Sequence, residues 1–83
     1  KEKISKMTIC FVLMQTKAGF VEKVVIKLNE IKEVKETYDV TGRIDNIVKV
    51  EGTDVETIAK TILAKIHNIE GVERIETHIV VPI

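Results

Sequence analysis

The sequence predicts an α+β domain whose strands and helices follow one another in the order βαββαβ. Apolar residues switch between the spacing of strands and that of helices along the chain, and the second half echoes the first at an offset of 38 residues. Hydrophobic residues make up 45% of the chain but aromatic ones only 4%, so Ile, Val and Leu must build the core. Such residues suit a sheet covered by helices. We expect residues 1–83 to form one domain, because a chain of this length cannot support two cores.

Residues 7–14 predict a first strand in which both faces are apolar. A strand covered on one side only would alternate with polar residues, so this strand is expected to be buried on both sides. One face carries Met7, Ile9, Phe11 and Leu13, and the other carries Cys10, Val12 and Met14.

The next three elements are a helix and a hairpin. After a turn at residues 17–19, a helical stripe is formed by Val21, Val24, Val25, Leu28 and Ile31. Residues 34–40 alternate between apolar and polar, as in a half-exposed strand. A short turn at residues 41–43 contains Gly42, which is free to take a positive φ. Residues 44–51 then predict the partner strand.

A second helix is predicted to open at residues 52–56. Thr53 and Glu56 have the spacing of a capping box, in which each side chain satisfies a backbone N–H group. The helix ends at residues 68–71, and residues 72–81 predict the last strand, with Pro82 preventing further pairing. The predicted core stripe of this helix consists of Val55, Ile58, Ala59, Ile62, Leu63 and Ile66.

Two βαβ halves of this kind form a ferredoxin-like sandwich, a four-stranded antiparallel sheet with two helices on one face. The helices cannot cover the other face, although the first strand is apolar there. Leaving three or four such side chains in water would forfeit roughly 1.5–3 kcal/mol each. We therefore expect a homodimer packed sheet to sheet, an α/β-barrel-like assembly with two-fold symmetry.

Composition bears on the classes of partner. Thirteen basic residues balance thirteen acidic ones, so the net charge gives no attraction for nucleic acid or for anionic lipid. No segment approaches the roughly 18 apolar residues of a membrane span. The single cysteine, Cys10, excludes a disulfide within the chain and favours a reducing, cytoplasmic compartment.

The sequence gives little support for catalysis, a metal or a cofactor. Cys10 lies in an apolar run, where a buried hydrophobe is favoured over a nucleophile that would need a neighbouring base. His67 and His78 form no cluster with metal-ligand spacing. The loop at residues 15–19 lacks the Cys-x-x-Cys of copper chaperones and the Arg of acylphosphatases, and residues 44–51 lack the aromatics of an RNA-recognition motif. We predict no catalytic residue, metal site or cofactor, and therefore no enzyme.

The hairpin at residues 38–46 is the candidate binding segment. A free amino acid needs an anion for its ammonium group and hydrogen-bond donors for its carboxylate. Asp39 or Asp45 could supply the anion, and the backbone of a turn containing Gly42 could supply the donors. The alternative interpretation is an ordinary hairpin, because turns favour Asp near their ends.

Three segments, at residues 34–45, 66–74 and 76–80, resemble the effector-binding domain of the Lrp/AsnC transcriptional regulators, also called the RAM domain. The resemblance rests on a V-T-G-x-x-D turn at residues 40–45 and an I-x-G-V-x-R segment at residues 69–74, and it extends over residues 7–82. It implies face-to-face dimers, rings of dimers such as octamers, and amino-acid effectors bound between dimers. The effector site that it implies consists of Tyr38, Val40, Thr41, Gly42, Asp45 and Thr77.

The resemblance also implies a role in transcription regulation of amino-acid metabolism. Full regulators carry an N-terminal helix-turn-helix that binds DNA, and nothing before Met7 could supply one. The chain is therefore either a stand-alone form of the domain, which is the better match, or an excised one. We expect it to bind no DNA directly and to associate with itself or with a full-length Lrp/AsnC regulator. The family often has an aromatic residue in place of Ile44 and a Thr in place of Ile75. These departures keep open a purely structural oligomerisation module without a ligand.

Overall fold

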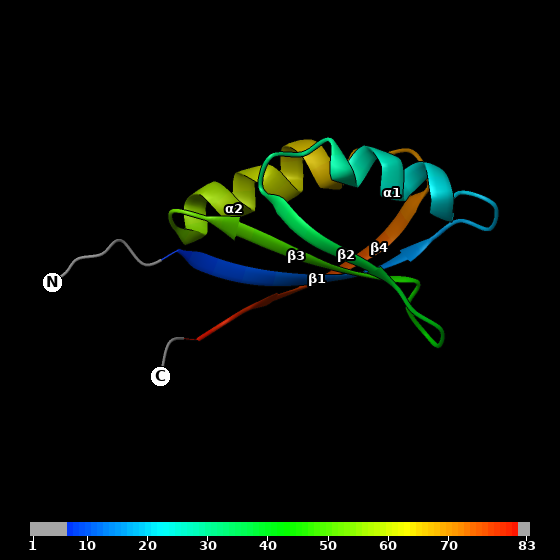
Figure 1. Cartoon of the computed structure of the whole chain (residues 1–83), viewed down its shortest axis with the longest axis horizontal. Coiled ribbons are helices and arrows are strands. Elements are labelled where there is room, and N and C mark those ends of the chain that lie inside the picture. The colour runs from blue at the N-terminus through cyan, green and yellow to red at the C-terminus, as the bar shows by residue number, and fades with distance from the viewer. Residues whose placement is uncertain (1–6, 82–83) are drawn as a thin grey trace, which may run out of the picture.

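A computed structural model of the chain describes residues 7–81 and has the predicted order of elements (Figure 1). A π-helical turn, η1, continues the second helix and was not predicted. The elements are β1 (Thr8–Thr16), α1 (Val21–Asn29), β2 (Val34–Asp39), β3 (Asn46–Gly52), α2 (Val55–Thr61), η1 (Ile62–Ile66) and β4 (Val72–Ile79).

The four strands form one antiparallel sheet in the order β2-β3-β1-β4, and both helices lie on the same face of it (Figure 1). This is the predicted ferredoxin-like arrangement. β1 is central: Val12 pairs with Val48 of β3 on one side and with Thr77 of β4 on the other. In the described part of the chain, no helix is long and apolar enough to cross a membrane.

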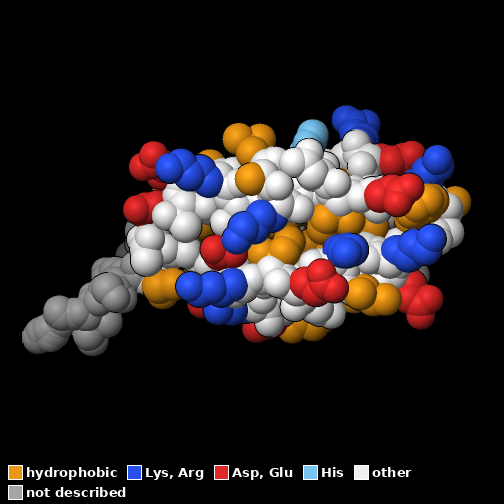
Figure 2. All heavy atoms as spheres, turned by 90° about the horizontal axis from the view of Figure 1, so that it is seen from above, with side chains coloured by type: hydrophobic (Ala, Val, Ile, Leu, Met, Phe, Trp, Pro, Cys, Tyr) orange, Lys and Arg blue, Asp and Glu red, His pale blue; other side chains and the backbone are white. Residues whose placement is uncertain are grey.

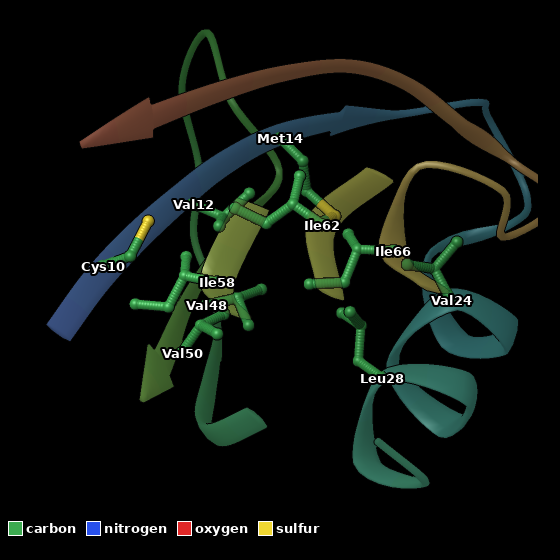
Figure 3. Close-up of a cluster of buried hydrophobic side chains, with 10 residues drawn as sticks. All are labelled: Cys10, Val12, Met14, Val24, Leu28, Val48, Val50, Ile58, Ile62 and Ile66. Atoms are coloured by element: carbon green, nitrogen blue, oxygen red, sulfur yellow. The ribbon is translucent and has the colours of Figure 1, made fainter. Parts of the chain in front are cut away.

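The core fills the space between the sheet and the helices (Figure 3). β1 has the two faces that its sequence predicts. Ile9, Phe11 and Leu13 are half-buried on the face without helices, which we call the open face. The buried core residues are Cys10, Val12, Met14, Val24, Leu28, Val48, Val50, Ile58, Ile62 and Ile66.

The second helix begins differently from the prediction. Its N-cap is Asp54, whose Oδ1 accepts a hydrogen bond of 2.7 Å from the backbone N–H of Thr57. Thr53 lies outside the helix, and its hydroxyl is 3.4 Å from the Thr57 hydroxyl. The capping-box prediction for Thr53 and Glu56 is therefore wrong, because the aspartate one residue later accepts the backbone hydrogen bond.

The predicted core stripe of this helix is too wide. Ile58, Ile62 and Ile66, each four residues apart, are buried. Val55 and Leu63 are 55% and 67% exposed, and Ala59 is exposed as well. Only the edge of the stripe that contains Ile58, Ile62 and Ile66 faces the sheet. The helix then widens at η1, where the N–H of His67 donates to the carbonyl oxygen of Ile62, five residues back, at 2.8 Å.

The loop between β2 and β3 is longer than the predicted three-residue turn. It covers residues 40–45, and the N–H of Val40 closes it by donating to the carbonyl oxygen of Asp45 at 3.0 Å. Gly42 has a φ of 123°, as its place in a turn predicts. At the other end of the chain, β4 ends at Ile79, and Pro82 lies outside the described residues.

Candidate functional site

A pocket of about 320 Å³ opens on the open face, where the loop at residues 40–45 meets β1 and β4. This volume lies at the lower end of the range for small-molecule sites. Apolar and charged residues both line it: Leu13, Gln15, Arg43, Ile44, Arg74, Ile75 and Glu76.

Strand pairing places the β4 residues of the pocket. Gln15 lies opposite Arg74, and Leu13 lies opposite Glu76. Because side chains alternate along a strand, Arg74 and Glu76 share the open face with these two β1 residues. The two β4 side chains are two residues apart, about 7 Å along the strand.

Three hydrogen bonds fix the loop against the end of β1. Gln15 Nε2 donates to the carbonyl oxygen of Arg43 at 2.7 Å. The backbone N–H of Asp45 donates to the Met14 carbonyl oxygen at 2.9 Å, and Asp45 Oδ2 accepts from the backbone N–H of Thr16 at 2.7 Å. These bonds hold Arg43 and Ile44 beside the β1 and β4 residues of the pocket.

The pocket carries an excess of positive charge. Within residues 7–81, neither Arg43 nor Arg74 has an acidic partner within 4.0 Å. The single carboxylate of the pocket belongs to Glu76, whose Oε2 lies 2.9 Å from Nε2 of His78. A guanidinium offers paired donors that match a carboxylate. The pocket can therefore hold a carboxylate, a cationic group and a short aliphatic chain.

The structure places four of the six predicted site residues together in the loop. Val40 is half-buried, Thr41 and Gly42 are exposed, and Asp45 is half-buried. None of the four lines the pocket, which is bordered instead by Arg43 and Ile44 from the same loop.

The other two predicted residues lie on strands. Tyr38 is 53% exposed opposite Ile47, and its hydroxyl donates to Glu36 Oε1 at 2.6 Å. This bond to a carboxylate raises the pKa of Tyr38, so the phenol stays a neutral donor. Thr77 lies opposite Val12, whose side chain points toward the helices. Ile75 and Glu76, which precede Thr77 on β4, line the pocket instead.

Both aspartates considered for an ammonium group already accept hydrogen bonds from the fold. Asp45 binds the Thr16 backbone, and Asp39 Oδ1 accepts from Asn46 Nδ2 at 2.5 Å. Asn46 is fully buried, and its own Oδ1 has no partner among the described residues. The two acids thus hold the ends of the loop in place.

The loop and β4, which the sequence singles out, both border the pocket, but its charged residues are not among the predicted ones. Arg74 and Glu76 are separated by one residue in a predicted strand, and that spacing alone places them on one face. Once β1 and β4 are paired, this spacing identifies Arg74 and Glu76 as candidate pocket residues. Arg43 gave no such signal, because the path of the loop depends on the hydrogen bond from Gln15.

The structure places Cys10 in the core and both histidines at the surface. Cys10 is fully buried, and burial raises the pKa of its thiol, which disfavours the reactive thiolate. His67 and His78 are exposed at a helix end and on β4. Within residues 7–81, no group of three His, Cys, Asp or Glu side chains could hold a metal ion.

A second hollow of about 390 Å³ lies between the two helices, on the opposite face (Figure 2). Figure 2 shows hydrophobic side chains on this face, with basic and acidic side chains around them. Two of its lysines have acidic neighbours: Lys27 is 3.8 Å from Glu30, and Lys65 is 3.2 Å from Glu33. Lys23 and Glu70 also line this hollow, and neither forms an ion pair within residues 7–81.

Comparison with known proteins identifies the family. A family model described as the Lrp/AsnC ligand binding domain matches residues 9–82. The chain belongs to the Lrp/AsnC family. This Lrp/AsnC domain is 35% identical over 75 residues to the HTH-type transcriptional regulator FL11 of Pyrococcus furiosus, covering 90% of the chain and 49% of that protein. The chain thus spans about half the length of the curated relatives that it matches.

Solved structures agree with the fold. FFRP-DM1 superposes with a TM-score of 0.86 at 36% identity, covering 89% of this chain and 99% of that one. Transcriptional regulator NMB0573 of Neisseria meningitidis, solved as a complex with L-Met, superposes with a TM-score of 0.83. It is 17% identical, with 90% of this chain and 50% of that chain covered, and supports the fold alone.

Proposed function

We propose that this Lrp/AsnC domain binds an amino-acid effector in the pocket on the open face and self-associates through that face. Its role is regulatory: effector binding changes assembly, and assembly changes transcription of genes for amino-acid metabolism. The domain catalyses no reaction and binds no DNA itself.

The observation that carries this proposal is the mixture of groups in the pocket. An arginine can hold the α-carboxylate, Glu76 can hold the ammonium group, and Leu13 and Ile44 offer an apolar wall. These are the groups that a free amino acid requires. The description of the matching family as a ligand binding domain supports the same interpretation.

Self-association is supported by the open face. Ile9, Phe11 and Leu13 of β1 and Ile47 of β3 are half-buried there without any helix above them. A second copy packed against these side chains would complete their burial. Homodimers formed in this way can assemble further into rings such as octamers, and a full-length Lrp/AsnC regulator in the cytoplasm is a second partner for the same surface.

A purely structural module is the alternative function. The specific observation in its favour is that Ile44 and Ile75 border the pocket without offering a side-chain hydrogen bond. Such a module would assemble with regulators in the same way but would bind no effector.

Thermal melting with a panel of the twenty amino acids distinguishes the two functions. We expect at least one amino acid to raise the melting temperature of the wild-type domain, because a ligand that binds only the folded state stabilises it. Glu76→Gln should reduce that shift. Glu73→Gln is the matched control, since Glu73 is exposed on β4 but does not line the pocket. A panel without any shift would favour the structural module.

A further inference from the structure

The two arginines of the pocket outnumber its one carboxylate, and this imbalance bears on which amino acid fits. Arg43 and Arg74 contribute two positive charges, and Glu76 contributes one negative charge. A neutral amino acid would pair its carboxylate with one guanidinium and its ammonium group with Glu76. The second guanidinium would then remain without a partner.

We propose that the pocket selects an acidic amino acid, L-glutamate or L-aspartate; this inference rests on the proposed function. The α-carboxylate and the side-chain carboxylate each bind one guanidinium, and the ammonium group binds Glu76. A ligand of net charge −1 neutralises a pocket of net charge +1. Leu13 and Ile44 contact the methylene groups between the two carboxylates.

The arrangement of the two arginines supports this assignment. Arg74 projects from β4 directly opposite Gln15, and the same Gln15 holds the backbone of Arg43 by its 2.7 Å hydrogen bond. The guanidiniums therefore come from two separate elements on either side of Gln15. Glu76 lies two residues after Arg74 on β4, so both side chains are on the same face of the sheet. Three charged groups at separate positions suit a ligand with three charged groups.

The availability of the arginines also supports it. Some charged side chains of the same sheet have ion-pair partners: Lys49, for example, lies 3.7 Å from Glu36 and 3.5 Å from Glu51. Arg43 and Arg74 have no such partner among the described residues. A bidentate arginine–carboxylate pair is among the stronger hydrogen-bonded contacts in proteins, and these two arginines are free to form one each.

Calorimetric titration of the wild-type domain with L-glutamate, L-aspartate, L-glutamine, L-leucine and 2-oxoglutarate tests the inference. L-glutamate or L-aspartate should bind most tightly. L-glutamine, which lacks the second carboxylate, should bind roughly 10- to 100-fold more weakly, as expected for loss of one charge-assisted hydrogen-bonded pair. 2-Oxoglutarate should also bind more weakly, because it has no ammonium group for Glu76.

Two variants identify the residues. Arg74→Gln and Arg43→Gln should each weaken L-glutamate binding to about the level of L-glutamine, and Arg43→Gln keeps the carbonyl group that Gln15 binds. Lys60→Gln is the control, because it removes the same charge from an exposed position on α2 outside the pocket. Circular dichroism melts verify that each variant folds.

The outcomes separate this inference from the proposed function. If L-leucine or L-glutamine binds as tightly as L-glutamate, the acidic specificity is wrong while effector binding stands. Equal binding of 2-oxoglutarate and L-glutamate would overturn the role of Glu76. If the arginine variants change only self-association, the guanidiniums serve the partner subunit and the inference fails. If no amino acid binds, the proposed function is wrong, and the acidic specificity is wrong with it.

Discussion

At the scale of single residues, Asp45 illustrates how one side chain can support a site without lining it. Its carboxylate accepts the backbone N–H of Thr16, and its own N–H binds the Met14 carbonyl oxygen. Both bonds fix the loop that carries Arg43 and Ile44. Asp45 was predicted to contact the effector; the structure gives it a positioning contact, and direct contact with an effector remains a prediction.

Asp45→Ala should destabilise the domain and also weaken effector binding. The substitution leaves the partly buried N–H of Thr16 without its acceptor, which costs about 1–3 kcal/mol in the free energy of unfolding. Asp45→Asn keeps an acceptor oxygen and should lose less. Urea unfolding of the three proteins measures the difference, and an unchanged midpoint for Asp45→Ala would show that the bond contributes nothing.

Cys10 gives a prediction about reactivity. Burial raises the pKa of its thiol and shields it from solvent, so the native protein should react slowly with iodoacetamide at pH 8. The same protein in 6 M guanidinium chloride should react at the rate of a free cysteine. Rapid alkylation of the folded protein would contradict the burial of this residue.

The charged residues of the pocket mark the limit of prediction at this scale. The sequence places Arg74 and Glu76 on a strand, but their relation to Leu13 and Gln15 depends on the pairing of β1 with β4. Arg43 depends on the side chain of Gln15, 28 residues away in the chain. Contacts between residues so distant are set by tertiary structure, which local patterns do not encode.

At the scale of elements, the start of the second helix shows how local rules compete. Thr53 and Asp54 are both favoured N-cap residues, and spacing to Glu56 pointed to the threonine. The structure uses the aspartate, whose carboxylate accepts the Thr57 N–H. This bond lowers the pKa of Asp54 below its usual range.

The lowered pKa of Asp54 predicts a pH dependence. A carboxyl group with a depressed folded-state pKa stabilises the fold above its ordinary pKa near pH 4, and this contribution is lost as the pH falls through the lowered value. Asp54→Asn retains a neutral cap without that titration. The difference in thermal stability between wild type and variant should therefore be present at pH 7 and vanish near pH 2. A difference independent of pH would contradict the role of the charge.

Gly71 gives a second prediction, at the turn into β4. Its φ is 101°, and an added Cβ would lie 2.6 Å from the Cβ of Phe20. Gly42 is the matched control: its φ is 123°, but an added Cβ would meet nothing within 4 Å. Gly42→Ala should cost roughly 1 kcal/mol for the backbone alone, and Gly71→Ala roughly 3 kcal/mol for the backbone and the overlap. Equal losses in chemical denaturation would mean that Phe20 moves aside freely.

The π-helical turn accounts for only part of the overestimated core, because Val55 and Ala59 are already exposed in α2 before the turn begins. The predicted stripe assumes 3.6 residues per turn throughout, whereas η1 inserts a wider turn at residues 62–66. Leu63 is left exposed while Ile62 and Ile66 stay buried. Such a turn has no dependable sequence signature, so the width of the buried stripe could be decided only from the structure.

At the scale of the whole molecule, the sequence predicted the fold well because each strand and helix has a clear period. The alternation of Cys10, Val12 and Met14 with Phe11 and Leu13 identified both faces of β1, and the structure confirms them. The order of strands follows from two right-handed βαβ units. What the open face packs against lies outside a single chain, and the sheet-to-sheet dimer stays a prediction.

A charged substitution on the open face tests that dimer. Phe11→Lys should shift the domain toward monomers, because it places a charge in the centre of the apolar surface proposed to be covered. Ile26→Lys is the control: Ile26 is 56% exposed on α1, on the opposite face. Sedimentation velocity measures the mass of the assembly that each variant forms. Equal assembly of the two variants would exclude the open face as the interface.

Native mass spectrometry tests the central claim, that this Lrp/AsnC domain is an effector-binding module that assembles. The spectrum is recorded for the freshly purified protein and again after addition of L-glutamate and L-aspartate. We predict complexes with even numbers of subunits that retain or take up one amino acid per pocket. A monomer that carries no amino acid under either condition would contradict the claim.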